Sequence, residues 1–205
     1  MKFRKTNLQE ALLHLQKDPV IKSLVKDYTI DEWNKYGNYL FIDLIDTIIS
    51  QQLSGKASEA ISKRFKSLFK TERIGPIDVL FVSDALLREC GLSLTKVSYI
   101  KGLAKAVNEK LIDIDSMHKL SDEKVIAELV KIKGIGRWTA EMILLFSLQR
   151  PDIFSLGDLG LRTAVSRLYG VDRNDFEKIE KISLTWSPYR SIASRYLWRS
   201  LSNKN

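Results

Sequence analysis

The sequence predicts an all-α fold, and three observations carry this prediction. Apolar residues recur with the helical period through nearly the whole chain. The segments with this period are separated by short breaks at glycine, proline or capping residues. No stretch alternates apolar and polar residues long enough to form a strand, and the short apolar run at residues 74–82 contains Gly75 and Pro76. We expect about ten helices with short connections.

The first helices can be placed in order along the chain. One covers residues 8–17 and stops before Pro19, which cannot continue a helix. The next covers residues 40–53 and carries an apolar stripe wide enough to be largely buried. A third, at residues 56–70, has an apolar face beneath a basic one. Further helices follow residues of the N-cap type, namely Ser83, Thr95 and Ser121.

Composition and charge limit the class of protein. The 205 residues suit one domain, or two small lobes that share a core, and 44% apolar content excludes a disordered chain. The formal net charge of +8 favours an acidic partner, most often nucleic acid, although a solvated basic surface also explains it. The single cysteine, Cys90, argues against a disulfide or a structural metal site. Neither a membrane span nor a signal peptide is visible, so we expect an intracellular protein.

The most informative stretch runs from residue 129 to residue 144. Two helical runs, the first beginning near residue 122, are interrupted there by a turn in which Gly134 and Gly136 flank Ile135. Glycine permits positive φ and lets another group come close to the backbone. We expect Ile135 to anchor this hairpin in the core.

The start of the second hairpin helix is a candidate phosphate site. Gly136, Arg137 and Thr139 lie where free N–H groups and the positive end of the helix dipole favour an anion. The alternative is a tight connection whose glycines merely end one helix. The neighbouring cations Lys131 and Lys133, in a chain of net positive charge, favour a grip on a nucleic-acid backbone.

This hairpin resembles the helix-hairpin-helix motif of a DNA glycosylase superfamily in which an aspartate follows the hairpin. Here Asp158 lies 20 residues after Trp138. Three further blocks, at residues 48–54, 90–104 and 186–198, resemble the alkylation-repair branch, the 3-methyladenine DNA glycosylase II family. The resemblance covers roughly residues 40–200 of the chain.

The resemblance assigns catalysis to Asp158. A Gly-Asp pair before an apolar run also fits a helix N-cap, and the two roles can coexist. Cleavage of an N-glycosidic bond builds positive charge on the sugar, which a fixed carboxylate can stabilise, or the carboxylate can activate water. Bifunctional relatives carry a Schiff-base lysine where this chain has Trp138, so the resemblance implies a monofunctional enzyme without lyase activity.

The resemblance also assigns residues that handle the base. Trp138 and Trp198 match pocket tryptophans, whose indoles would attract a cationic methylated purine by roughly 1–2 kcal/mol. Filling the core is the alternative role for tryptophans in this chain, and Trp186 fits it best. Met142 stands where a bacterial relative has a pocket aromatic residue. Gln52 matches a wedge residue that fills the space left by the flipped nucleotide.

Further binding roles are implied in the same way. Lys96 and Tyr99 are phosphate-contact candidates by analogy, and they would add to the grip expected from Lys133 and Gly134 of the hairpin. In relatives, hairpin carbonyls hold a monovalent cation, which here implies Na⁺ or K⁺ at the backbone of Val130, Ile132 and Ile135. Endonuclease-type relatives have four cysteines for an iron–sulfur cluster near the C-terminus, and this chain has none there, so we expect no such cofactor.

Together these features imply a single helix-hairpin-helix glycosylase domain over residues 1–205, with the hairpin at about 129–146 and an active-site cleft between two helical lobes. We expect a monomeric base excision repair enzyme that flips alkylated purines, of the 3-methyladenine and 7-methylguanine type, out of double-stranded DNA and hydrolyses their glycosidic bond. It would be cytoplasmic in a prokaryote and nuclear in a eukaryote. The alternatives are a glycosylase for another damaged base and a DNA-binding protein without chemistry. Asp158 and Trp138 argue against the last.

Overall fold

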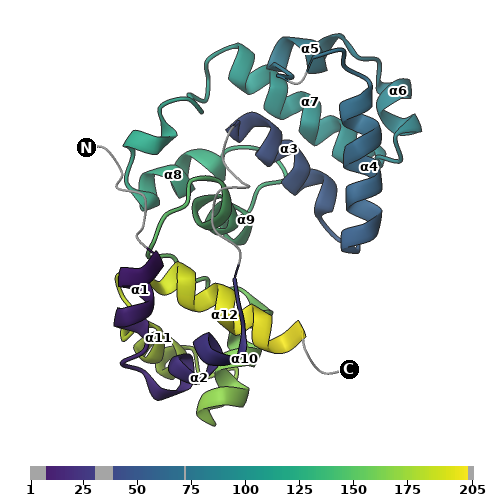
Figure 1. Ribbon diagram of the computed structural model, residues 1–205. Coiled ribbons are helices and arrows are strands. Elements are labelled where there is room, and N and C mark those ends of the chain that lie inside the picture. The colour runs from purple at the N-terminus through teal and green to yellow at the C-terminus, as the bar shows by residue number, and fades with distance from the viewer. Residues whose placement is uncertain (1–7, 31–38, 72, 203–205) are drawn as a thin grey trace. The chain divides into compact units, whose positions relative to one another are not determined.

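The computed structural model describes residues 8–30, 39–71 and 73–202, and these residues form helices and connecting loops without a strand. The all-α prediction is confirmed (Figure 1). The chain divides into two compact units. Unit 1 combines the described residues up to 30 with those from 144 onward, and unit 2 contains the described residues between 39 and 143. None of the described helices is long and apolar enough to cross a membrane.

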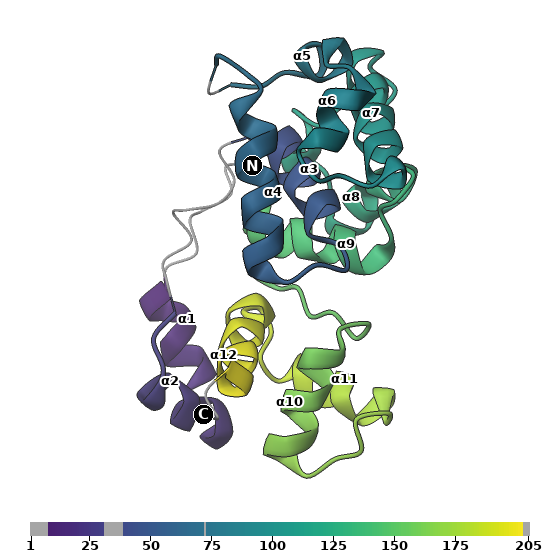
Figure 2. The same ribbon diagram turned by 90° about the vertical axis from the view of Figure 1, so that its right-hand side faces the viewer.

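Unit 2 is built around its longest helix, α7 (Leu94–Asn108), which packs against α3, α5 and α6 (Figures 1 and 2). The apolar stripe of α3 is completely buried, as its width predicts. The other elements of this unit are α3 (Leu40–Ser50), α4 (Gly55–Ser67), α5 (Pro76–Phe81), α6 (Asp84–Glu89), the 3₁₀ turn η2 (Met117–Lys119), α8 (Asp122–Leu129) and α9 (Arg137–Met142).

Two lysines of α7 cap the ends of helices that pack against it. Lys96 Nζ donates hydrogen bonds of 2.8 Å to the carbonyl oxygens of Ile49 and Gln51, where α3 ends. Lys101 Nζ donates at 2.8 Å to the carbonyl oxygen of Leu80, near the end of α5. The last carbonyls of a helix have no partner within it, so an ammonium group there satisfies them and complements the helix dipole.

Several predicted boundaries are wrong by a few residues: the helix predicted at residues 8–17 ends at Leu15, and the one predicted at residues 56–70 ends at Ser67. The helix predicted to run through residue 53 ends at Ser50, because Gln52 adopts a left-handed conformation with φ 58° that an α-helix cannot contain. The helix expected after Thr95 begins before it. Its N-cap is Ser93, whose Oγ accepts the main-chain N–H of Lys96 at 3.3 Å. Thr95 therefore lies in the first turn.

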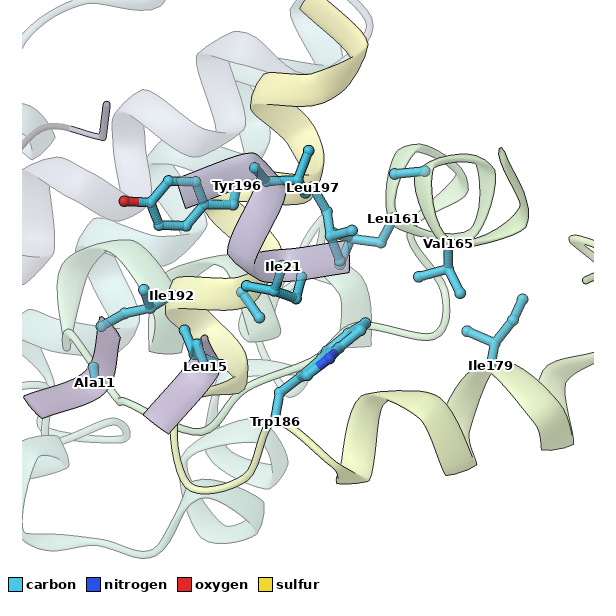
Figure 3. Packing of buried hydrophobic residues seen from close by; sticks show 13 residues of the cluster. Ala11, Leu15, Ile21, Leu161, Val165, Ile179, Trp186, Ile192, Tyr196 and Leu197 are labelled. Atoms are coloured by element: carbon cyan, nitrogen blue, oxygen red, sulfur yellow. The ribbon is translucent and has the colours of Figure 1, made fainter. Parts of the chain in front are cut away.

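Unit 1 encloses its own apolar core around Trp186 (Figure 3). This side chain is fully buried, and its Nε1 donates at 3.0 Å to Asp18 Oδ2, which also accepts the Tyr169 hydroxyl at 2.7 Å. Trp186 is therefore a core residue. The elements are α1 (Leu8–Leu15), α2 (Pro19–Asp27), α10 (Leu159–Tyr169), α11 (Phe176–Leu184) and α12 (Arg190–Ser202), with α2 and α10 packed against α12. A π-helix, η3 (Ile143–Ser147), follows α9 at the point where the chain passes into unit 1.

Candidate functional site

Asp158 is the N-cap of helix α10, and its carboxylate accepts hydrogen bonds from Leu161 and from Trp198. Its Oδ1 accepts the main-chain N–H of Leu161 at 2.7 Å, which confirms the predicted N-cap. The same oxygen accepts the indole N–H of Trp198 at 2.9 Å. The residue is only 9% exposed. These contacts fix the orientation of a nearly buried carboxylate.

Trp198 reaches this carboxylate because of its neighbours. Phe146 lies against its indole with ring centroids 5.7 Å apart and an interplanar angle of 23°. Gly160 provides the space: a Cβ at this position would lie 3.0 Å from Asp158 Oδ1 and 3.2 Å from the indole. Sequence reasoning missed both Phe146 and Gly160. The only available signal was a glycine two residues after the aspartate.

The segment that leads to this carboxylate is tied to the start of α12, the helix that carries the indole. Asp152 forms a two-point ion pair with Arg190, at 2.8 Å to Nε and 3.0 Å to Nη2, and accepts the Ser187 hydroxyl at 2.8 Å. Burial alone would raise the pKa of Asp152, but the hydrogen bonds and the positive charge outweigh burial and hold this pKa below its usual range. Ser191 Oγ accepts the N–H of Ile153 at 2.9 Å.

The hairpin in unit 2 has the predicted construction. Ile135 is buried and anchors it. Gly134 has φ +94°, and a Cβ there would lie 2.2 Å from Cδ2 of Tyr99, so only glycine fits against this ring. Gly136 is the N-cap of α9, has no side-chain cap and has open space around the position of a Cβ. No side chain of the N-cap residue therefore covers the main chain at the start of α9.

The side chains expected to contact phosphate differ in their surroundings. Lys133 is exposed, whereas Thr139 is buried and only 5% exposed, so a phosphate contact by Thr139 stays a prediction. Arg137 donates to Glu123 Oε1 at 3.2 Å and to Glu141 Oε1 at 3.0 Å. The hydrogen bond to Glu123, and the negative charge of both acids, raise the pKa of this guanidinium above its ordinary value.

Lys96 has a structural role that the analogy did not anticipate, because its ammonium caps α3. Burial lowers the pKa of this amine. A phosphate contact by Lys96 stays a prediction.

The remaining expected residues lie in or near the hairpin helices. Trp138 is 45% exposed and Met142 is 9% exposed. Val130, Ile132 and Ile135, whose carbonyls are expected to hold a monovalent cation, lie in the turn between α8 and α9, and this cation site stays a prediction. The carbonyl oxygen of Ile132 also accepts the N–H of Ile135 at 3.0 Å. The described residues contain no group of three His, Cys, Asp or Glu side chains that could hold a metal ion.

The candidate wedge, Gln52, is exposed at the tip of the turn between α3 and α4. Its neighbour Gln51 was not singled out from the sequence. Gln51 Nε2 donates at 2.8 Å to the carbonyl oxygen of Gly134, 83 residues away in the chain. This hydrogen bond joins the wedge turn directly to the hairpin.

Comparison with known proteins places the chain in a family. A family model described as HhH-GPD superfamily base excision DNA repair protein matches residues 45–188. DNA-3-methyladenine glycosylase 1 of Schizosaccharomyces pombe is 34% identical, over 95% of this chain and 88% of that protein. DNA-3-methyladenine glycosylase of Saccharomyces cerevisiae is 33% identical, over 92% and 77%. The solved structure of the S. pombe 3-methyladenine DNA glycosylase in complex with abasic DNA has a TM-score of 0.82 at 33% identity, covering 94% of this chain and 97% of that one. The chain belongs to the HhH-GPD superfamily of base excision DNA repair proteins.

Proposed function

We propose that this protein is a monofunctional DNA glycosylase that removes alkylated purines, such as 3-methyladenine and 7-methylguanine, from double-stranded DNA. The observation that carries the proposal is the carboxylate of Asp158, held by Leu161 and Trp198 at the start of α10. The relatives named DNA-3-methyladenine glycosylase support this substrate class.

The proposed reaction is hydrolysis of the bond between the sugar C1′ and the purine nitrogen. As that bond breaks, its electron pair leaves with the base and positive charge develops on the sugar. The Asp158 carboxylate stabilises this charge without having to reorient, since its donors already hold it. Water then adds to C1′ and loses a proton, which leaves an abasic site. A purine alkylated at N3 or N7 departs as a neutral molecule, so the reaction needs little acid catalysis.

We propose Trp138, Met142 and Trp198 as the residues that contact the extruded base. An indole attracts a cationic purine more strongly than a neutral one, by roughly 1–2 kcal/mol. The ease of extruding a weakly paired base adds to this selectivity. Trp138 occupies the hairpin position of the Schiff-base lysine, and an indole cannot form that covalent intermediate. The enzyme therefore leaves the strand intact, and hydrolysis needs no redox cofactor.

The proposal gives the hairpin the grip on the DNA backbone and Gln52 the role of the wedge. The backbone contacts are assigned to Lys133, Gly134, Gly136, Arg137, Thr139 and Lys96. A monovalent cation at the hairpin carbonyls would add one more positive charge facing phosphate. Such an enzyme acts as a monomer on cellular DNA, in the cytoplasm of a prokaryote or the nucleus of a eukaryote.

Base release from methylated duplex DNA tests the proposal. The protein is incubated with alkylated DNA, released bases are identified by mass spectrometry, and abasic sites are counted by alkaline cleavage. We expect release of 3-methyladenine and 7-methylguanine. Duplexes with hypoxanthine or an oxidised purine run in parallel: exclusive release of one of those bases would make the protein a glycosylase for another lesion. Tight binding with no base released would contradict enzymatic function altogether.

A further inference from the structure

The turn between α3 and α4 is fixed at Gln51 from two directions. The Gln51 side chain donates to the carbonyl oxygen of Gly134 at 2.8 Å, and its main-chain carbonyl accepts the Lys96 ammonium at 2.8 Å. The next residue, Gln52, is exposed and left-handed, with φ 58°. A non-glycine residue persists in this conformation where the surrounding structure holds it. The wedge candidate is therefore an exposed side chain on a backbone that is held in place immediately before it.

The hairpin is held by the same face of α7. Tyr99 follows Lys96 by three residues, so the two side chains lie on one face of the helix. The Tyr99 ring contacts the backbone of Gly134, where a Cβ would lie 2.2 Å from the ring. Lys96 and Tyr99 thus contact the wedge turn and the hairpin respectively, and Gln51 joins the turn to the hairpin directly. All of these residues belong to unit 2.

We propose that Gln51, Lys96 and Tyr99 form a brace that sets the distance between the wedge residue Gln52 and the hairpin. In this brace the three are positioning residues: they touch neither the sugar nor the base, and act through Gln52. For Lys96, this positioning role is separate from the phosphate contact proposed above. This inference rests on the proposed function and extends it, because it assigns the coupling between backbone grip and base extrusion to three side chains that lie outside the reaction itself.

The physical reason is preorganisation. Extrusion of a base requires the protein to hold the strand while a side chain enters the base stack. If the wedge could move freely relative to the grip, ordering it would oppose insertion each time a base is flipped. A brace orders the wedge before DNA binds, so that gripping the phosphates brings Gln52 to the stack in the correct place.

The substitution Gln51→Met tests the brace, since it keeps the length of the side chain and removes the donor to Gly134. Single-turnover release of 7-methylguanine should fall about tenfold in duplex DNA, the effect of one lost hydrogen bond on the extruded state. In single-stranded DNA no base has to leave a paired stack, so the rate should fall less than about twofold. The matched control is Gln16→Met, the same change at a half-buried glutamine of unit 1, which should leave both rates unchanged.

A double-mutant cycle shows whether Gln51 acts through Gln52. In a Gln52→Ala background, Gln51→Met should lower the single-turnover rate on duplex DNA by less than about twofold, because the wedge side chain that Gln51 positions is already absent. Equal losses on duplex and single-stranded DNA, or effects that simply multiply in the double mutant, would overturn the brace. A wild-type rate in the Gln51→Met protein would overturn it as well.

A second readout separates the brace from the proposed chemistry. A duplex with 2-aminopurine beside a stable abasic analogue reports unstacking by fluorescence without any base release. Gln51→Met should bind this duplex as wild type does but lose most of the fluorescence increase; a full increase overturns the brace. If wild type released no alkylated purine, the proposed function would fail while this readout would still decide the brace. Gln51→Asn keeps the amide on a shorter side chain, so this variant should lose part of the fluorescence increase. It takes the place of Gln51→Met if Gln51→Met does not fold.

Discussion

The indole nitrogen of Trp198 lies 2.9 Å from Oδ1 of Asp158, so this tryptophan orients the carboxylate in addition to the proposed contact with a base. Gly160 leaves room for the approach, and Phe146 packs against the indole. A hydrogen bond to a charged group contributes about 1.5–3 kcal/mol when it is well aligned. Much of the effect of any change at Trp198 should therefore come through the carboxylate.

The variant Trp198→Phe tests this role, because it keeps an aromatic ring against Phe146 and removes the N–H. Base release should fall at least about tenfold on both 7-methylguanine and hypoxanthine duplexes, since the carboxylate acts on the sugar in either case. Any larger loss on the cationic lesion measures the cation–π attraction, which we expect to add roughly 1 kcal/mol. Single-turnover rates on the two duplexes check this, provided wild type acts on both. An unchanged rate would show that the indole N–H does not serve Asp158.

Asp158→Asn should abolish most base release while the fold persists. Its amide oxygen can still accept the N–H groups of Leu161 and Trp198, but the negative charge that stabilises the sugar is gone. We expect a loss of at least about 10²–10³-fold in single-turnover rate. Affinity for a duplex with an abasic analogue and the thermal unfolding midpoint should both stay close to wild type. Normal release by this variant would refute the assignment of the catalytic residue.

The two hairpin glycines should respond differently to substitution. Gly136→Ala should be tolerated, because a Cβ meets nothing within 4 Å, whereas Gly134→Ala should destabilise the protein by its clash with Tyr99. Gly136→Asp then tests the phosphate grip in a folded protein. This substitution should weaken the affinity of the protein for damaged and undamaged duplexes by a similar factor, because a contact with phosphate does not depend on the base sequence. Gly136→Asn is the uncharged control. If Gly136→Ala, Gly136→Asp and Gly136→Asn all bound DNA equally well, the hairpin would be a structural turn without a phosphate contact.

The tryptophan at position 138 predicts an outcome in a trapping experiment. Borohydride reduces a Schiff base between a lysine and the sugar to a stable protein–DNA adduct. We expect no adduct on gel electrophoresis, under conditions in which a bifunctional glycosylase is trapped efficiently. A robust adduct would mean that another lysine reaches the sugar and that the enzyme also has lyase activity.

Local sequence patterns predicted those parts of the fold that depend on nearby residues. The periodic stripe of α3 is buried, Ile135 anchors the hairpin, and Asp158 caps α10, because each feature depends on residues within a few turns of helix. The end of α3 was misplaced by a few residues because nothing in the local pattern shows that Gln52 takes a left-handed conformation.

Contacts between distant segments were beyond prediction from these patterns. The hydrogen bond from Gln51 to Gly134 and the stacking of Phe146 on Trp198 join residues whose distance in space is set by the packing of whole helices. Lys96 is a further case, because a flexible lysine can reach solvent, phosphate or a helix end with equal ease. Its burial against the carbonyls of α3 is visible only in the folded unit.

The ion pair between Asp152 and Arg190 makes a prediction about stability and pH. The pKa of Asp152 is lower in the folded protein than its unfolded value of about 3.9, so the pair contributes stability above that pH and loses it as pH falls through the lower folded value. Asp152→Asn should lower the free energy of unfolding by roughly 2–3 kcal/mol at pH 7, and this difference should shrink below about pH 4. Urea denaturation at pH 7, 5 and 3 measures it. Glu180→Gln, at an exposed position of α11, should change stability by less than about 0.5 kcal/mol throughout. A difference between wild type and Asp152→Asn that is equally large at pH 3 would mean that the introduced amide disturbs the packing of unit 1 and that the charge of the carboxylate contributes little.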